Sequence, residues 1–213
     1  MRPVRAILLA LVLWLLAAPA PAEPVRLRIL HVNDFHGFAE PHRPRGSETP
    51  VGGVAHLAAH VRELRRGGPS VLLAAGDMIQ GHPWANLTQG ASAIEVMNAM
   101  GFDAMALGNH ELDFGQEVLT RRIGEAAFPL LAANVDGFAA VRPWVVLERG
   151  GLRVAVIGAV TQDTPTSTHP RNVAGLGFRP AEEAVLRAVA ELHHGHAGPF
   201  EIEHFGLSLL QNF

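Results

Sequence analysis

Three short segments of the sequence carry residue types that can bind a cation or move a proton. Residues 33–37 read NDFHG, residues 76–77 read GD, and residues 108–113 read GNHELD. Carboxylate oxygens and imidazole nitrogens are common ligands of divalent cations, and histidine also carries protons near neutral pH. Asp34 and His36 are two positions apart, so both can reach one cation from the same side of an extended chain. The segments therefore predict a metal site with a proton carrier nearby.

Each segment also has a simpler interpretation when it is taken alone. Asp34 and His36 could be a turn residue beside a surface histidine, and Asp77 could cap a helix that follows a strand. Residues 108–111 are more specific, because Gly108 lets the backbone approach closely while asparagine and histidine supply a neutral ligand and a proton carrier. The three segments gain weight together, because each follows an apolar stretch that is typical of a buried strand.

The stretches around these segments alternate between strands and helices. Strands are predicted directly before the three polar segments, at 25–32, 71–75 and 104–107, and again at 129–133, 144–147 and 152–160. Apolar residues at helical spacing predict helices at 54–64, 94–100, 116–127 and 181–192. This alternation indicates an α/β layered domain with a largely parallel sheet. Because ligands of such sheets bind beyond the carboxyl ends of the strands, the polar segments are expected to meet in one crevice.

The composition narrows the class of protein. With 213 residues, a formal charge of −3 and 48% hydrophobic residues, the chain can form a packed core and lacks the positive charge of a nucleic-acid binder. The chain has no cysteine, which excludes disulfides, thiolate nucleophiles and cysteine-ligated zinc. Its 12 histidines are therefore the only good nitrogen ligands for a metal.

The three segments in this order, with the residues around them, resemble the calcineurin-like metallophosphoesterases. Residues 29–37, ILHVNDFHG, and residues 101–113, GFDAMALGNHELD, look like the secreted bacterial branch that holds 5′-nucleotidases and UDP-sugar hydrolases. Val32 and Leu112 stand where this branch usually has threonine and phenylalanine, and neither residue bears on metal chemistry. The resemblance covers about residues 27–161 and implies a layered α/β/β/α sandwich, of which this chain holds the first half.

The resemblance implies a phosphoric ester hydrolase with two divalent cations, drawn from Mn, Zn, Co, Mg and Ca. Two such cations, about 3.5–4 Å apart, generate a hydroxide at neutral pH and neutralise charge on the phosphoryl oxygens. By the same resemblance, Asp34 and His36 hold one cation and Asn109 holds the other. Asp77 is expected to bridge both cations, because a carboxylate has two oxygens.

The resemblance also assigns residues that do not bind metal. His110 is expected to face the substrate phosphate or leaving oxygen, and Asp113 is expected to pair with His110 and fix its tautomer. Glu111 is expected to be structural. No role is expected for the remaining histidines of the first half of the chain, which are His31, His42, His56, His60 and His82.

Some parts of the family's pattern are missing from the chain. The family completes its site with one histidine in an H-x-G and two in a G-H-x-H; His204-Phe205-Gly206 is a candidate for the first, and the second is absent. We also expect the chain to lack the C-terminal domain with which this branch binds the nucleoside. We therefore expect residues 23–192 to be the N-terminal part of the catalytic domain, and residues 193–213 to be a divergent tail from a truncated or frame-disrupted gene.

Two functions of different kinds stay open at this point. The first is dephosphorylation of nucleotides or related esters by an enzyme of the 5′-nucleotidase type. The second is a non-catalytic fragment of such an enzyme that binds metal weakly. Within the first, UDP-sugar hydrolysis, cyclic-nucleotide cleavage and thiosulfohydrolase chemistry cannot be separated without the substrate domain.

The start of the chain predicts secretion. Residues 1–22 combine Arg2 and Arg5 with an apolar run over 6–18 and end in small residues, which is the pattern of a cleavable signal peptide. An uncleaved anchor is the less favoured alternative, because a spanning helix needs about 20 apolar residues. We expect a periplasmic chain that starts at Glu23, acts on a small nucleotide or phosphate ester, and binds neither nucleic acid nor, after cleavage, the membrane. The oligomeric state stays open.

Overall fold

The computed structural model describes residues 25–195 of the chain. The predicted signal peptide at 1–22, the candidate ligand His204 and the rest of the tail from residue 196 lie outside these residues. In the part of the chain that the structure describes, no helix combines the length and the apolar character needed to cross a membrane.

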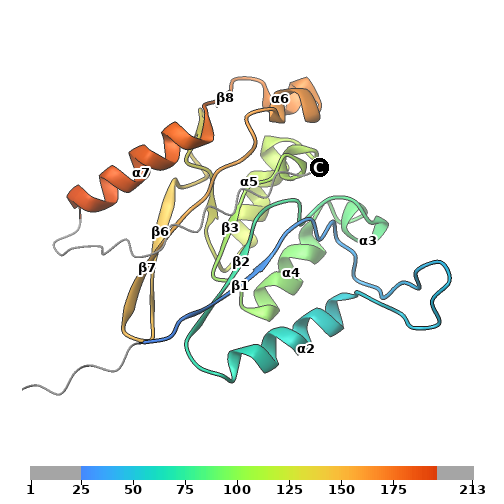
Figure 1. The fold of residues 1–213 in the computed structure, drawn as a ribbon. Helices are drawn as coiled ribbons and strands as arrows, with labels where there is room; N and C mark the ends of the chain where they lie inside the picture. The colour runs from blue at the N-terminus through green and yellow to red at the C-terminus, as the bar shows by residue number, and fades with distance from the viewer. Residues whose placement is uncertain (1–24, 196–213) are drawn as a thin grey trace, which may run out of the picture.

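A four-stranded parallel sheet forms the centre of the domain (Figure 1). Its strands lie in chain order: β1 (Arg28–Val32), β2 (Ser70–Ala74), β3 (Ala104–Ala106) and β4 (Leu130–Leu131). Ile29 of β1 lies opposite Val71 of β2, and Leu73 of β2 lies opposite Ala104 of β3. Because the strands are parallel, their C-terminal ends meet at one edge of the sheet. The predicted α/β fold with a parallel sheet is confirmed.

Three helices that connect the strands pack together on one face of the sheet. They are α2 (Val54–Arg65), α4 (Ala91–Met100) and α5 (Gln116–Glu125). Val61, Ile94 and Leu119 project from these helices into one apolar core, where they join Leu72 and Met105 of the sheet. All five residues are buried, and each large apolar side chain contributes about 1.5–3 kcal/mol by leaving water.

An antiparallel hairpin and the last helix lie on the other side of the sheet (Figure 1). The hairpin consists of β6 (Trp144–Arg149) and β7 (Leu152–Ile157), and the helix is α7 (Ala181–Gly195). Ala184 and Ala188 of α7 are buried against Trp144 and Ile157 of the hairpin. This arrangement gives the domain its layered form.

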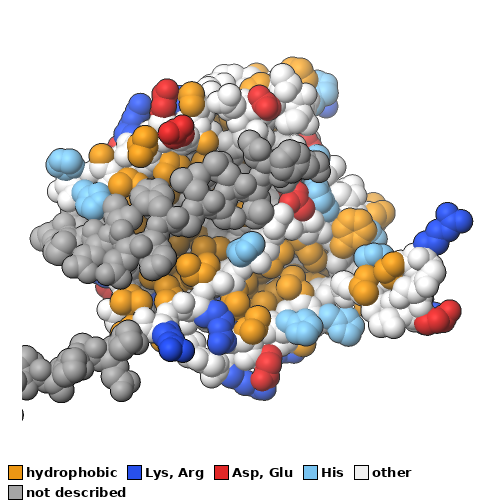
Figure 2. All heavy atoms as spheres, in the orientation of Figure 1, with side chains coloured by type: hydrophobic (Ala, Val, Ile, Leu, Met, Phe, Trp, Pro, Cys, Tyr) orange, Lys and Arg blue, Asp and Glu red, His pale blue; other side chains and the backbone are white. Residues whose placement is uncertain are grey.

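The hairpin side of the sheet is packed less completely than the helix side. Neither β6 nor β7 has a fully buried residue, and Ile29 on β1 is 60% exposed. Hydrophobic side chains accordingly reach the surface on the face that Figure 2 shows. The second layer of the sandwich is thus only partly formed by the described residues, in line with the incomplete sandwich expected from the sequence.

Several short elements were not predicted from the sequence. They are α3 (Pro83–Asn86), η1 (His110–Leu112), β5 (Val135–Asp136), α6 (Thr164–Ser167), η2 (Pro170–Val173) and β8 (Gly177–Phe178). Elements of two to four residues carry no periodic pattern, so a periodicity argument cannot detect them. Helix α7 also continues past its predicted end at Leu192 to Gly195, because the intervening histidines do not break a helix.

Candidate metal centre

The three polar segments meet at the C-terminal edge of the sheet. Asp34 and His36 follow β1, Asp77 follows β2, and His110 follows β3. Several backbone bonds join the first two loops. The Asp34 N–H donates to the Gly76 carbonyl at 3.2 Å, the His36 N–H donates to the Asp77 carbonyl at 2.9 Å, and the His82 N–H donates to the His36 carbonyl at 2.8 Å. The loops are therefore held in a fixed register relative to each other.

Two glycines let the backbones of the loops after β2 and β3 come into contact. A Cβ atom at Gly108 would overlap Oδ1 of Asp77, and one at Gly76, where φ is 97°, would lie 2.6 Å from the Gly108 nitrogen. Neither approach is possible for a real side chain. Glycine at both positions is therefore required for Asp77 to occupy its place.

Three of the predicted metal ligands have a left-handed backbone. Their φ angles are 51° at Asp34, 48° at His36 and 57° at Asp77. Among the described residues, Gln89 is the only other residue besides glycine in this region. Such a conformation costs of the order of 1–3 kcal/mol and persists only where the surroundings enforce it, as functional sites often do. Backbone strain is thus concentrated at the loops that carry these side chains.

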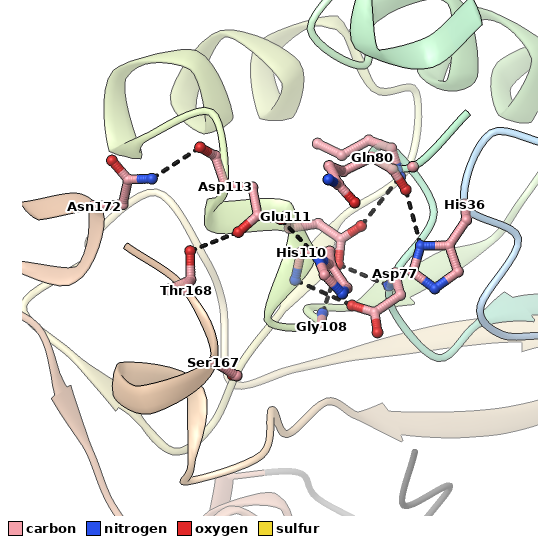
Figure 3. A network of polar contacts seen from close by, with 12 residues as sticks. His36, Asp77, Gln80, Gly108, His110, Glu111, Asp113, Ser167, Thr168 and Asn172 are labelled. Carbon is pink, nitrogen blue, oxygen red and sulfur yellow. Dashed lines mark hydrogen bonds and ion pairs between the residues drawn. The ribbon is translucent and has the colours of Figure 1, made fainter. Parts of the chain in front are cut away.

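The side chains of His36, Asp77 and His110 come together and form a candidate metal site (Figure 3). One possible ligand atom from each residue, a ring nitrogen or a carboxylate oxygen, lies within 4.8 Å of the other two. The two imidazole rings meet edge to face with centroids 5.1 Å apart. The Nδ1 of His36 donates to the Gln80 carbonyl at 2.9 Å, which leaves Nε2 free to bind a cation. Histidine ligands of metals are usually oriented in this way. The nitrogen and oxygen donors suit a divalent cation.

Two other predicted ligands lie next to this group. Oδ1 of Asp34 is 3.7 Å from Nε2 of His36, close enough for both atoms to bind one cation, and Oδ2 of Asp34 accepts a hydrogen bond from the Asn33 amide. Asn109 is 8% exposed and precedes His110 at the start of η1. The ligand roles of Asp34, His36, Asp77 and Asn109 stay predictions. The non-ligand role of His110 also stays a prediction, because its ring lies in the same candidate group as His36 and Asp77.

Glu111 ties the loops after β2 and β3 together. Its side chain is fully buried, and Oε2 accepts hydrogen bonds from the N–H groups of Asp77 at 2.9 Å and Gly108 at 2.7 Å. Oε1 accepts from Met78 at 2.8 Å and from Ile79 at 3.3 Å. Burial raises the pKa of Glu111, the charge of Asp77 raises it further, and the backbone donors lower it, so that the net shift is upward. Because all four neighbours are donors, both oxygens serve as acceptors, in line with the structural role expected for Glu111.

His110 is oriented by Asp113. The two side chains form a hydrogen bond between Nδ1 of His110 and Oδ2 of Asp113 at 2.6 Å. The backbone N–H of His110 donates to Oδ1 of Asp77 at 3.1 Å. Burial lowers the pKa of His110, but the bond to Asp113 and the charges of Asp77, Asp113 and Glu111 outweigh it, so that the pKa is raised. The pairing leaves Nε2 of His110 available to a substrate oxygen or a cation.

Two residues at the site were missed by sequence reasoning. Thr168 donates from Oγ1 to Oδ1 of Asp113 at 2.6 Å, and Asn172 donates from Nδ2 to the Asp113 carbonyl at 2.8 Å (Figure 3). Both lie in the segment of α6 and η2, which is 55 to 59 residues downstream of Asp113. A run of threonines and serines is common in loops, so the sequence carries no local signal for this contact.

A parallel sheet with candidate metal ligands on the loops at its C-terminal edge is the arrangement expected of a metallophosphoesterase. This chain belongs to the calcineurin-like phosphoesterase family, whose model matches residues 27–213. The family resemblance and the metallophosphoesterase fold expected from the sequence are thereby confirmed.

Several proteins with sequences similar to this chain are 5′-nucleotidases. The 5′-nucleotidase of Vibrio cholerae is 34% identical over 192 residues, which cover 82% of this chain and 34% of the relative. The human 5′-nucleotidase is 39% identical over 181 residues, which cover 77% of this chain and 31% of the relative. The crystal structure of a 5′-nucleotidase precursor from Thermus thermophilus matches with a TM-score of 0.71 and 34% identity, over 79% of this chain and 35% of that one. The chain therefore spans about a third of the length of these relatives.

Proposed function

We propose that this chain carries part of the catalytic domain of a 5′-nucleotidase-type hydrolase, which removes phosphate from nucleotides or related esters. The observation that carries the proposal is the convergence of His36, Asp77 and His110, with His110 bonded to Asp113. The 5′-nucleotidases that are 34% and 39% identical to the chain support the class of substrate.

The cofactors in this proposal are two divalent cations. Asp34 and His36 would hold one cation, Asn109 would hold the other, and Asp77 would serve as a ligand of both. The position of Asp77 supports this role, because its loop is bonded to the loop after β1 and its carboxylate contacts the loop after β3. Bound divalent cations would lower the pKa of water and neutralise charge on a phosphoryl group.

The side chains of His110 and Asp113 have separate roles in this proposal. Asp113 holds the Nδ1 proton of His110, which fixes the tautomer and turns Nε2 towards the cluster. From there, Nε2 contacts the phosphate or the leaving oxygen and can deliver a proton to it.

We also propose that the protein is secreted to the periplasm. The charged and apolar pattern of residues 1–22 supports a cleavable signal peptide. The similar Thermus thermophilus protein is described as a precursor, which is consistent with processing. Mass spectrometry of the protein from a periplasmic fraction tests the proposal: the mature chain is expected to begin at Glu23, and a chain that retains Met1 would contradict it.

The hydrolase proposal is tested on the full chain with Mn²⁺. We expect metal binding by titration calorimetry and turnover of p-nitrophenyl phosphate and a nucleoside 5′-monophosphate. Both should be lost in Asp77→Ala and kept in Asp136→Ala, which changes an exposed carboxylate that is paired only with Arg179 among the described residues. Metal binding without Asp77-dependent turnover would instead identify the chain as a non-catalytic, metal-binding fragment.

A further inference from the structure

We propose that Thr168 is a positioning residue for the His110–Asp113 pair. Its hydroxyl fixes the plane of the Asp113 carboxylate and, through it, the direction of the His110 ring. The catalytic consequence of this role rests on the proposed hydrolase function, whereas its effect on the hydrogen bond between His110 and Asp113 does not.

Each oxygen of the Asp113 carboxylate has its own partner. Oδ2 is 2.6 Å from Nδ1 of His110, and Oδ1 is 2.6 Å from Oγ1 of Thr168. A carboxylate that is held by one oxygen can rotate, because the torsion about its terminal carbon–carbon bond has broad minima. Since Asp113 keeps 22% of its side chain exposed, water would compete for an oxygen without a partner. The second bond therefore restricts the carboxylate to the plane in which it meets the imidazole.

The backbone that carries Thr168 is fixed by its surroundings. The Thr168 backbone N–H donates to the Thr164 carbonyl at 3.1 Å. Thr164 is fully buried, and its hydroxyl donates to the Thr161 carbonyl at 2.6 Å. At the other end of the segment, Asn172 binds the Asp113 carbonyl. The segment that carries Thr168 is thus anchored on both sides of the contact.

The neighbouring hydroxyl groups serve a different purpose. Those of Thr164, Thr166 and Ser167 all donate to backbone carbonyls within the same segment, which is a local structural role. Thr168 instead donates to the side chain that orients His110 (Figure 3). This difference separates Thr168 from the other hydroxyl residues of the loop and supplies a matched control.

The experiment compares three variants of the full chain: Thr168→Val, Thr168→Ser and the control Thr166→Val. Valine keeps the shape of threonine without the hydroxyl, and serine keeps the hydroxyl. With Zn²⁺ bound and ¹⁵N-labelled histidine, the Nδ1 proton of His110 is observed by NMR and assigned through its loss in His110→Gln. We expect this signal to move or broaden in Thr168→Val and to stay in place in Thr168→Ser and Thr166→Val.

Kinetics with p-nitrophenyl phosphate provide the second measurement. We expect kcat to fall about tenfold in Thr168→Val, with KM and bound metal unchanged, because even a misplacement of about 1 Å can cost up to about 100-fold in rate. Serine should restore most of kcat. An unchanged NMR signal in Thr168→Val, or an equal change in Thr166→Val, would overturn the proposal. If the unsubstituted chain shows no turnover, the hydrolase function fails and the NMR signal alone decides the role of Thr168.

Discussion

Gly108 lies directly against the carboxylate of Asp77, in a space where no side chain fits. A Cβ at this position would overlap Oδ1 and would be 2.6 Å from the backbone nitrogen of Asp77. The same carboxylate oxygen accepts a hydrogen bond from the backbone N–H of His110 at 3.1 Å. The contact therefore sets the position of the proposed bridging ligand relative to the loop that carries His110.

Replacing Gly108 by alanine should weaken metal binding and also lower stability, because the added carbon would meet both the carboxylate and the backbone nitrogen of Asp77. The added methyl group displaces the Asp77 carboxylate, and we expect Mn²⁺ affinity to fall about tenfold or more. Titration calorimetry measures the effect. The matched control is Gly124→Ala on α5, where the added carbon meets no atom within 4 Å apart from its own helix backbone and chain neighbours. Gly124→Ala should keep the affinity and raise the free energy of unfolding by up to about 1 kcal/mol. If the two variants bind Mn²⁺ with equal affinity, the contact between Gly108 and Asp77 does not position the metal ligand.

Glu111→Gln should destabilise the fold although it changes only one atom. Both carboxylate oxygens of Glu111 face backbone donors, and an amide would place its NH₂ group against two N–H groups. We expect the free energy of unfolding, measured in urea, to fall by about 2–3 kcal/mol. The control Glu95→Gln changes an exposed residue of α4 and should stay within about 0.5 kcal/mol of the original chain. A similar stability for both variants would rule out the proposed role of Glu111.

Alanine at His110 distinguishes a ligand from a residue that faces the substrate. If His110 is not a ligand, His110→Ala should bind nearly as much Mn²⁺ as the original chain while turnover falls by about 100-fold or more. Asp77→Ala should lose both properties. Metal content by mass spectrometry and p-nitrophenyl phosphate kinetics provide the comparison. An emptied site in His110→Ala would show that His110 binds metal, which its distance from His36 and Asp77 also permits.

Asp103 should be important for stability although it lies outside the site. Its side chain is 8% exposed and accepts the Leu72 N–H at 2.8 Å, and it pairs with Arg65 from α2 and Arg149 from β6. Asp103→Asn should lower the free energy of unfolding by about 2 kcal/mol, because two charge-assisted bonds are weakened. Asp136→Asn, whose side chain is 56% exposed beside Arg179, should cost less than about 1 kcal/mol. If urea unfolding shows the same loss of free energy for Asp103→Asn and Asp136→Asn, the buried ion pairs of Asp103 do not contribute the expected stability.

The longer elements of the fold could be predicted from the sequence because their signals are local. Helix α2 was expected at 54–64 and lies at Val54–Arg65, since apolar spacing and the following glycines mark its ends. Strand β4 was expected at 129–133 but covers only Leu130–Leu131. The two residues that follow it, Ala132 and Ala133, donate instead to the carbonyls of Arg142 and Gly158, which lie in a later segment of the chain. Tertiary pairing of this kind cannot be read from composition or periodicity.

The candidate site shows the same division between local and distant information. Asp34, His36 and Asp77 could be proposed because each directly follows an apolar strand in a recognisable order. Thr168 could not, because its contact with Asp113 arises only when a segment 55 residues downstream folds back over the loop after β3. The left-handed backbone of the candidate ligands could not be predicted either, because aspartate and histidine are enriched in this conformation but adopt it only in a minority of cases.

The backbone bonds between the loops after β1 and β2 have a consequence for protein engineering. The unusual conformation at Asp34 and His36 is maintained by partners at Gly76 and Asp77, so neither loop encodes it alone. Grafting one loop onto a foreign scaffold would transfer the side chains without the neighbours that shape them. A transplant of this centre must therefore move both loops, with their strands in the original register, as one unit.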